Sequence, residues 1–384
     1  MDHMLQKDPE NFHVDRFRPI NFLEADANFN LKFMARRAMA HGEDNNIIAK
    51  EQYGSKKQHS SETQALNKRL TYDAWCLRKT PGVLCSNDAK SCYDRILHVI
   101  EAICLRRFGL EKGPISSMIE TLQGMAHMIN TAWGTCDGYG PEVWHWPLQG
   151  ILQGNGAGPC IWLVISVTIF SMMWEEGFGI KFTTQVSKET GHLVGYAIVD
   201  NADIVETAAS NSASGDEILN RAQEGLDHWE GGLRATGGAI VPKKSHWCYV
   251  DFEWIRGRWK YAPFDKERQL WVRDESGRKV QLEQVPVNEA RRTLGVYLSP
   301  DGNNSDMKRV LLNKARTWAE HIRLGHLGRD KSWRALRTTI HKTIEFSLLS
   351  TTFTKKDLRE IMGPVLKQGL SQSGFANTFQ REIV

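Results

Sequence analysis

Cysteine is sparse and widely spaced in this chain. Seven cysteines occur among 384 residues, and no two of them form a Cys-x-x-Cys pair. An odd number of isolated cysteines argues against a disulfide framework, and the missing Cys-x-x-Cys pair argues against a structural zinc site. We therefore expect reduced thiols, which are typical of an intracellular compartment.

The chain also lacks a long uninterrupted apolar run. The most apolar stretch, Cys160–Trp174, contains Ser166, Thr168 and Ser171 and is shorter than the roughly 18 residues that a membrane helix needs. The opening residues MDHMLQKDPE have no apolar centre, so they do not resemble a signal peptide. The sequence predicts a soluble intracellular protein without distinguishing cytoplasm from nucleus, and it contains neither an internal repeat nor a low-complexity tract.

Charge is nearly balanced over the whole chain but unevenly placed. The chain has 49 Lys and Arg against 45 Asp and Glu, a formal net charge of +4. Residues 305–384 contain 15 Lys and Arg and 7 Asp and Glu, so this segment carries +8 and the remainder −4. A basic end on a mildly acidic body suggests a polyanionic partner. A pair of solvent-exposed basic helices explains the same count.

The apolar pattern predicts alternating helices and strands. Helices are expected over Leu31–Ala40, Ser61–Leu77, Arg95–Phe108, a segment beginning at Pro159, and Leu219–Arg234. Strands are expected over Gly82–Ser86, Leu193–Val199, Ile204–Thr207, His246–Trp254, Trp271–Arg273 and Leu294–Leu298, with a helical C-terminal part. Strands and helices mixed in this way, with acids at strand ends, predict an α+β fold in which helices cover one face of a sheet.

The first candidate for chemistry is the segment NDAKSCYDR at residues 87–95. A strand is predicted to end at Asp88, where a carboxylate can face a cation above the sheet, and a helix is predicted to begin near Asp94. Taken alone, the pattern favours the simpler interpretation, in which Asp94 caps the helix and Asp88 is a solvated turn residue.

A glycine-rich loop, LQGNGAGP at residues 152–159, is the second candidate. Its glycines allow a ligand to approach the backbone closely, and a following helix directs free N–H groups outward. The loop lacks the Lys-Ser/Thr ending of a phosphate-binding P-loop, which excludes that assignment. By itself it is compatible with an ordinary turn between a strand and a helix.

The third candidate is GYAIVDNAD at residues 195–203. An apolar strand is predicted to carry Asp200 to an acidic hairpin tip at residues 200–203, and solvent-facing turns often contain such acids. Asp88 and Asp200 are 112 residues apart, yet adjacent strands would bring them side by side. Two such carboxylates repel each other unless a divalent cation lies between them, and hard oxygen ligands select magnesium or manganese. This is the arrangement of two-metal phosphoryl transfer.

In this order, the segments resemble the reverse transcriptase domain of non-LTR-type retroelements, which has the right-hand polymerase fold. The resemblance covers seven segments: FRPINFLEADANFNLK and EQYGSKKQHSSE of the fingers, and NDAKSCYDRI, LQGILQGNGAGP, YAIVDNAD, ATGGAIVPKKSHW and TLGVYL as palm motifs A to E. It implies fingers, a palm with an antiparallel sheet covered by helices, and a helical thumb. The implied boundaries are 1–82 for truncated fingers, 83–110 for the first part of the palm, 111–147 for an insertion, 148–304 for the palm with motifs B to E, and 305–384 for the thumb-like segment.

The resemblance also implies a role for each matching residue. Asp88 and Asp200 would hold Mg²⁺ or Mn²⁺, with help from the carbonyl of Ala89. Tyr93 would exclude the 2′-hydroxyl of a ribonucleotide. Gln153 and Gly154 would lie against the nascent base pair.

Basic residues and the last palm motif would contact the rest of the substrate. Arg18 would bind the triphosphate, and Lys244, or secondarily Lys243, would approach the pyrophosphate. Surface solvation remains the alternative for these cations. Thr293–Leu298 would brace the primer strand. The implied partners are an RNA template, a DNA primer and deoxynucleoside triphosphates, and no membrane is implied.

Motif C departs from the family at Asn201, which stands where a second aspartate is usual. The resemblance therefore leaves two functions open: a reverse transcriptase domain, and a catalytically impaired retroelement remnant that keeps its affinity for nucleic acid. An RNA-templated RNA polymerase is a third possibility, against which Tyr93 argues. The chain is expected to be a fragment of a larger retroelement polyprotein, because no endonuclease or RNase H segment accompanies these motifs.

Overall fold

The computed structural model describes residues 1–7, 10–11, 13, 17–131, 134–138, 149–184, 186–208 and 215–376. The chain forms two compact units, each assembled from separate stretches of sequence. Unit 1 comprises residues 1–59, 81–249 and 265–284, and unit 2 comprises residues 60–80, 250–264 and 285–384. The fingers, palm and thumb boundaries stay predictions, and parts of the predicted insertion and of the C-terminal end lie outside the described residues.

A five-stranded sheet forms the centre of unit 1. Its order is β15 (Glu283–Gln284), β10 (His246–Val250), β3 (Gly82–Asp88), β9 (Asn201–Thr207) and β8 (Gly195–Ile198). β9 runs antiparallel to both β3 and β8, whereas β10 pairs with β15 in parallel. Nearly every residue of β3 and β9 is at least partly buried, as expected for short apolar strands in the middle of a sheet.

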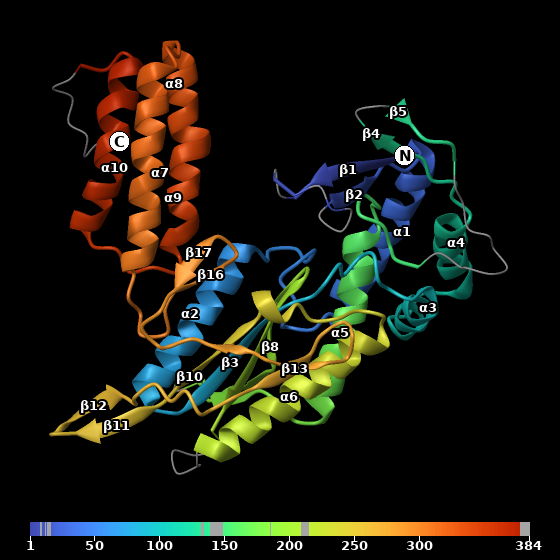
Figure 1. The fold of residues 1–384 in the computed structure, drawn as a ribbon, viewed down its shortest axis with the longest axis horizontal. Helices are drawn as coiled ribbons and strands as arrows, with labels where there is room; N and C mark the ends of the chain where they lie inside the picture. Colours follow the sequence, from blue (N-terminus) through green and yellow to red (C-terminus); the bar gives the residue numbers. More distant parts are fainter. Residues whose placement is uncertain are drawn as a thin grey trace. The chain divides into compact units, whose positions relative to one another are not determined.

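Two long helices accompany this sheet (Figure 1). α6 (Gly215–Ala235) packs against β3 and β9, and α5 (Gly158–Glu175) packs against α6. α5 is the one helix of the described residues that is long and apolar enough to cross a membrane, but 67% of it is buried within the protein. Its apolar character is therefore explained by a place in the core, where its side chains pack with those of β8, β9 and α6.

Smaller elements complete unit 1. The helices are α1 (Ala25–Asp44), α3 (His98–Arg107) and α4 (Lys112–Gln123), with a short 3-10 helix, η2, at Pro242–Lys244. A second sheet has the order β2 (Phe17–Asn21), β1 (Asp2–Gln6), β4 (Ile129–Thr131) and β5 (Gly134–Thr135). Two hairpins are β6 (Ile180–Thr183) with β7 (Thr190–Leu193), and β13 (Trp271–Arg273) with β14 (Lys279–Gln281).

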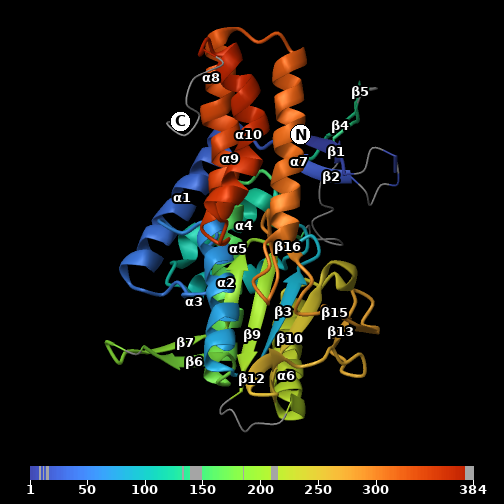
Figure 2. The same cartoon turned by 90° about the vertical axis from the view of Figure 1, so that its left-hand side faces the viewer.

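Unit 2 is mainly helical and has a core of its own. Its helices are α2 (Ser61–Arg78), α7 (Ser305–Leu324), α8 (Arg329–Ala335), the π-helical turn η3 (Leu336–Ile340), α9 (His341–Leu348) and α10 (Lys355–Gln372). α7, α9 and α10 lie side by side in both ribbon views (Figure 2). Two hairpins belong to this unit: β11 (Phe252–Ile255) with β12 (Arg258–Tyr261), and β16 (Arg291–Thr293) with β17 (Val296–Leu298).

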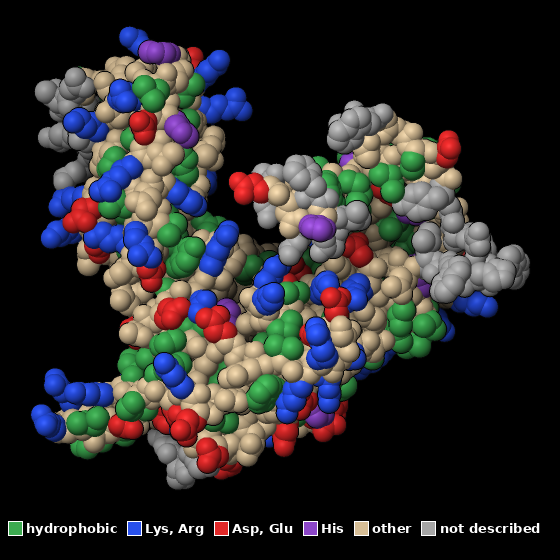
Figure 3. Space-filling model, in the orientation of Figure 1, with side chains coloured by type: hydrophobic (Ala, Val, Ile, Leu, Met, Phe, Trp, Pro, Cys, Tyr) green, Lys and Arg blue, Asp and Glu red, His purple; other side chains and the backbone are tan. Residues whose placement is uncertain are grey.

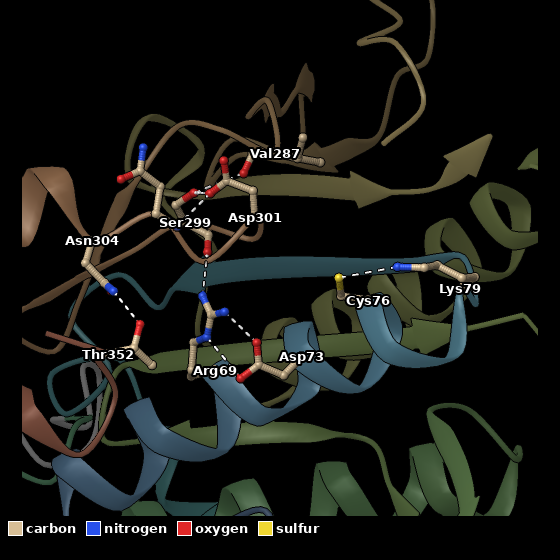
Figure 4. Close-up of polar contacts among 10 residues, drawn as sticks. Arg69, Asp73, Cys76, Lys79, Val287, Ser299, Asp301, Asn304 and Thr352 are labelled. Atoms are coloured by element: carbon tan, nitrogen blue, oxygen red, sulfur yellow. Dashed lines mark hydrogen bonds and ion pairs between the residues drawn. The ribbon is translucent and has the colours of Figure 1, made fainter. Parts of the chain in front are cut away.

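Arg69 connects α2 with the chain that follows β17 (Figure 4). Its guanidinium donates to both carboxylate oxygens of Asp73, at 2.5 and 3.2 Å, and to the backbone carbonyl of Ser299 at 3.2 Å. The Ser299 hydroxyl in turn donates to Asp301 and to the Val287 carbonyl. This network fixes the turn that leads into α7.

The structure corrects several element boundaries. The helix expected from Arg95 begins at His98 with Leu97 as its N-cap, so Asp94 does not cap it. The tip expected at residues 200–203 is instead a turn at Val199 and Asp200, because Asn201 already pairs with Ile198 as the first residue of β9. Leu294 likewise lies in a turn before β17 and not in a strand.

Candidate active site

The sheet of unit 1 brings Asp88 and Asp200 together. Asp88 is the last residue of β3 and stands opposite Asn201 in the β3–β9 register. Asp200 immediately precedes Asn201 in the hairpin turn, and its carbonyl accepts a 2.8 Å hydrogen bond from the backbone N–H of Ala89. The two acids, distant in sequence, therefore end neighbouring strands at the same edge of the sheet.

The turn that carries Asp200 has a strained backbone. Val199 has a φ of +51°, and a β-branched residue is a genuine outlier in this left-handed region. The indole N–H of Trp162 in α5 donates to the Val199 carbonyl at 2.5 Å. Strain of this kind persists only where the surroundings hold it, and it clusters at functional sites.

The electrostatics of Asp88 reflect its position. Burial raises its pKa, the nearby ammonium of Lys244 lowers it, and the charge of Asp200 raises it again, for a net increase. Lys244, in η2, places Nζ 3.5 Å from Oδ1 of Asp88. The backbone N–H of Asp88 donates to the Ser245 hydroxyl at 3.1 Å, which ties the end of β3 to the residue after η2.

Asn201 lies beside both acids. Its side-chain amide donates to Oδ1 of Asp200 at 3.2 Å, and the residue is exposed. The amide thus supplies a hydrogen bond to the carboxylate, where an aspartate would add a second negative charge.

The donor set at this edge fits a divalent cation. Asp88 and Asp200 offer hard carboxylate oxygens, and a cation would stabilise the ionised form of Asp88 against its burial. The described residues contain no group of three His, Cys, Asp or Glu that could hold a metal. Two carboxylates are nevertheless sufficient for Mg²⁺ when substrate phosphates complete its coordination.

Tyr93 lies close to this edge, and the neighbouring Asp94 holds Gln153. The side-chain amide of Gln153 donates to Oδ2 of Asp94 at 3.0 Å, and the backbone N–H of Ile151 donates to the Tyr93 carbonyl at 2.7 Å. Burial raises the pKa of Tyr93, with a further increase from the charges of Cys92 and Asp200. Sequence reasoning missed this role of Asp94, because its spacing from the following apolar residues suggested a helix cap.

Gly154 lets the loop of residues 152–159 pack against the end of β2. Its φ is +121°, and a Cβ at this position would collide with the backbone carbonyl of Asn21. The backbone N–H of Asn21 donates to the Gln153 carbonyl at 2.7 Å. The glycine is therefore required by close packing of the backbone, whatever further role the loop has.

Arg18 is exposed on β2, the strand that ends at Asn21. It is close enough to Asp94 to lower the pKa of that carboxyl, although burial raises it by more. Its guanidinium is thus available near the loop of residues 152–159. Ala89 is buried; its backbone N–H bonds Asp200. Lys243 lies next to Lys244 in η2.

The segment at residues 51–54 has a structural role that its sequence did not reveal. The backbone N–H of Ala197 donates to the Glu51 carbonyl at 2.8 Å, and that of Tyr53 donates to the Ala197 carbonyl at 2.9 Å. The segment thereby covers the free edge of β8. Buried Gln52 donates to the Ser166 hydroxyl at 2.5 Å. A buried polar residue leaves no signal in a hydrophobic pattern, so only the resemblance of EQYGSKKQHSSE to a fingers segment pointed to these residues.

Thr293–Leu298 belongs to unit 2. These residues comprise the end of β16, the turn at Leu294 and Gly295, both with positive φ, and β17. Val296 and Leu298 are buried in the core of that unit. The assignment of this hairpin to the primer strand stays a prediction.

Comparison with known proteins gives structural neighbours only. No protein-family model matches the chain, and no curated protein matches it in sequence. Apo telomerase from Candida tropicalis is 10% identical, with a TM-score of 0.43, over 89% of this chain and 53% of that one. Telomerase from Candida albicans in complex with the TWJ fragment of telomeric RNA is 12% identical, with a TM-score of 0.41, over 94% of this chain and 59% of that one.

The chain thus spans little more than half the length of these telomerase chains. TM-scores this low do not establish a common fold.

Proposed function

We propose that this chain is an RNA-directed DNA polymerase domain of retroelement type, which adds deoxynucleotides to a primer 3′-hydroxyl. The observation that supports it best is the pairing of β3 with β9, which places Asp88 beside Asp200 at one edge of the sheet. The raised pKa of Asp88 adds to this, because a carboxylate held next to another acid in a half-buried position is typical of a site that receives a cation.

In this proposal, Asp88 and Asp200 hold two magnesium or manganese ions, and the carbonyl of Ala89 contributes a further oxygen. The cations would activate the primer hydroxyl and neutralise charge on the pyrophosphate leaving group. Lys244, which forms an ion pair with Asp88, turns toward the pyrophosphate when substrate is bound. Because it is exposed and only 3.5 Å from Asp88, this needs only a rotation of its side chain.

The remaining residues bind and select the nucleotide. Tyr93 closes the space beside the sugar and so excludes a 2′-hydroxyl. Gln153, fixed by Asp94, lies against the new base pair together with Gly154. Arg18 binds the triphosphate, since a guanidinium matches phosphate oxygens in geometry and charge.

Primer extension tests the proposal. We expect the protein with an RNA template, a DNA primer, Mg²⁺ and the four deoxynucleotides to extend the primer. The variants Asp88→Asn and Asp200→Asn should each lose activity by roughly a thousandfold or more, because metal ions supply several kcal/mol of transition-state stabilisation. Exposed Asp216→Asn at the start of α6 is the matched control. Equal activity in all four proteins would refute the assignment of the two acids.

Asn201 favours a second candidate, an impaired polymerase that retains nucleic-acid binding. Its neutral amide lies beside Asp200. Motif C therefore has one carboxylate where two aspartates are usual. We expect Asn201→Asp to raise the rate of extension at least severalfold, because added negative charge strengthens cation binding. The rate should be measured over a range of Mg²⁺ concentrations. An Asn201→Asp protein that binds template but extends no primer would favour the remnant.

A further inference from the structure

A sharply turned hairpin of unit 2 carries exposed aromatic rings. β11 and β12 are joined by Arg256 and Gly257 alone, with φ values of +50° and +79°. Positive φ at both central residues defines the tight turn that matches the twist of the flanking strands. The register pairs Ile255 with Arg258 at this turn and Trp254 with Trp259 one position further along the strands.

The aromatic side chains share one face of the hairpin, since the paired positions Phe252–Tyr261 and Trp254–Trp259 alternate with Glu253–Lys260 and Ile255–Arg258, which lie on the other face. The Phe252–Tyr261 pair is partly buried at the base. Nearer the turn, Trp254 is 60% exposed and Trp259 is 47% exposed. Their rings meet edge to face, with centroids 5.2 Å apart and an interplanar angle of 72°. An edge-to-face pair that is this exposed leaves ring surface open to a flat ligand.

The same tip is strongly basic. Arg256, Arg258 and Lys260 are exposed, and the one acid of the two strands, Glu253, stands opposite Lys260. Within the described part of the chain, none of these three cations has an ion-pair partner. Lys and Arg side chains gather with hydrophobic ones over the β11–β12 hairpin in Figure 3.

We propose that the tip of the β11–β12 hairpin binds single-stranded nucleic acid. Bases stack on Trp254 and Trp259, and the backbone phosphates follow the turn, pairing with Arg256 at its apex and with Arg258 and Lys260 on the other face. Aromatic rings interleaved with cations are the recurring means of holding a single strand without reading its sequence. The inference deepens the proposed function and rests on it, because a polymerase must hold a single strand as template or as primer.

The apex of the turn argues against a membrane surface as the occupant. Trp254 and Trp259 flank the sequence Ile-Arg-Gly-Arg, so insertion of the rings into lipid would draw two guanidinium groups with them. Charged groups are costly in the hydrocarbon region. The phosphates of a nucleic acid, by contrast, can pair with these guanidinium groups at the exposed turn.

Fluorescence anisotropy with short labelled uridine RNA and thymidine DNA strands tests the inference, on the full chain without metal or nucleotide. The two strands distinguish an RNA ligand from a DNA ligand, and tighter binding of either one supports the inference. The double variant Trp254→Ala/Trp259→Ala should bind roughly tenfold to a hundredfold more weakly, given the usual value of base stacking on aromatic residues. The variant Arg256→Gln/Arg258→Gln/Lys260→Gln should lower the slope of log affinity against log salt by about two units.

The β6–β7 hairpin of unit 1 provides the matched control. It also exposes an aromatic ring and two lysines, and the control variant is Lys181→Gln/Phe182→Ala/Lys188→Gln. Its affinity should equal that of the unmodified protein. Equal loss in both hairpins, or undiminished affinity in the tryptophan variant, would overturn the inference. So would tryptophan-dependent sedimentation with phosphatidylserine vesicles in a protein whose strand affinity does not depend on Trp254 and Trp259.

A stacking readout separates direct contact from a loss of folding. A fluorescent purine analogue in the strand should be quenched by the unmodified protein and by Trp254→Phe/Trp259→Phe, but not by the alanine variant. The Asp216→Asn protein should bind the strand normally. If the unmodified protein fails to extend primers yet shows hairpin-dependent binding, the proposed function fails and this inference stands.

Discussion

Glu101 is a buried carboxylate that the candidate site does not use. It lies on α3, fully inaccessible to solvent, and neither of its carboxylate oxygens has a hydrogen-bond partner among the described residues. Burial alone raises its pKa from 4.5 to about 8. A single residue thus makes the stability of the protein depend on pH.

The sign of this dependence follows from proton binding. Below about pH 4.5, both the folded and the unfolded chain hold the proton; between about 4.5 and 8 only the folded chain retains it. The free energy of unfolding should therefore fall by a few kcal/mol as pH rises through this window. Glu101→Gln removes the titration, so its stability relative to the unmodified protein should increase over the same range. Denaturant unfolding at several pH values measures the difference.

Exposed Glu120→Gln on α4 is the control for that series, and its difference from the unmodified protein should not change with pH. A constant difference for Glu101→Gln as well would mean that the carboxylate has a partner when ionised.

At the scale of elements, the loop of residues 152–159 depends on the backbone of Gly154. Alanine at this position meets the Asn21 carbonyl and is strained at a φ of +121°. We expect Gly154→Ala to lower the free energy of unfolding by about 1–3 kcal/mol. Hydrogen exchange of the Asn21 amide, which bonds the Gln153 carbonyl, should accelerate. Gly113 lies in α4, and a Cβ added there would meet open space. Gly113→Ala should therefore be neutral or stabilising. Unchanged Asn21 exchange in Gly154→Ala would contradict the packing described.

The elements themselves were predictable where one physical signal dominates. The periodicity around Leu219–Arg234 predicted α6, and the apolar run after Pro159 predicted α5. The turn at Val199 was not predictable, because a β-branched residue with positive φ contradicts local propensity and is held by Trp162 from another element.

The candidate site was predictable only in part, for the same reason. The position of Asp88 at the end of a strand followed from the local sequence. The hydrogen bond of Asp94 to Gln153 joins residues 59 positions apart, and no local pattern encodes it. The expectation that adjacent strands bring Asp88 and Asp200 side by side came from the position of both acids at predicted strand ends.

On the scale of the whole molecule, the two units differ in the sign of their net charge. Unit 2 contains 24 Lys and Arg against 13 Asp and Glu, a formal charge of +11, which leaves −7 for unit 1. Arg309, Arg316 and Arg323 are exposed at intervals of seven residues along α7, so they form one stripe on the helix. A polyanion is therefore expected to bind mainly through unit 2.

The salt dependence of RNA binding tests this expectation. The variant Arg309→Gln/Arg316→Gln/Arg323→Gln should reduce the slope of log affinity against log salt by up to about two units for a single strand, because each released phosphate contact removes about 0.7. Arg309 and Arg323 already face Asp306 and Glu320, which makes two units an upper bound. Exposed Lys112, Lys181 and Lys188 of unit 1, changed to glutamine together, remove the same charge. If this second variant lowers the slope as much as the first, net charge alone governs binding and the α7 stripe has no special role.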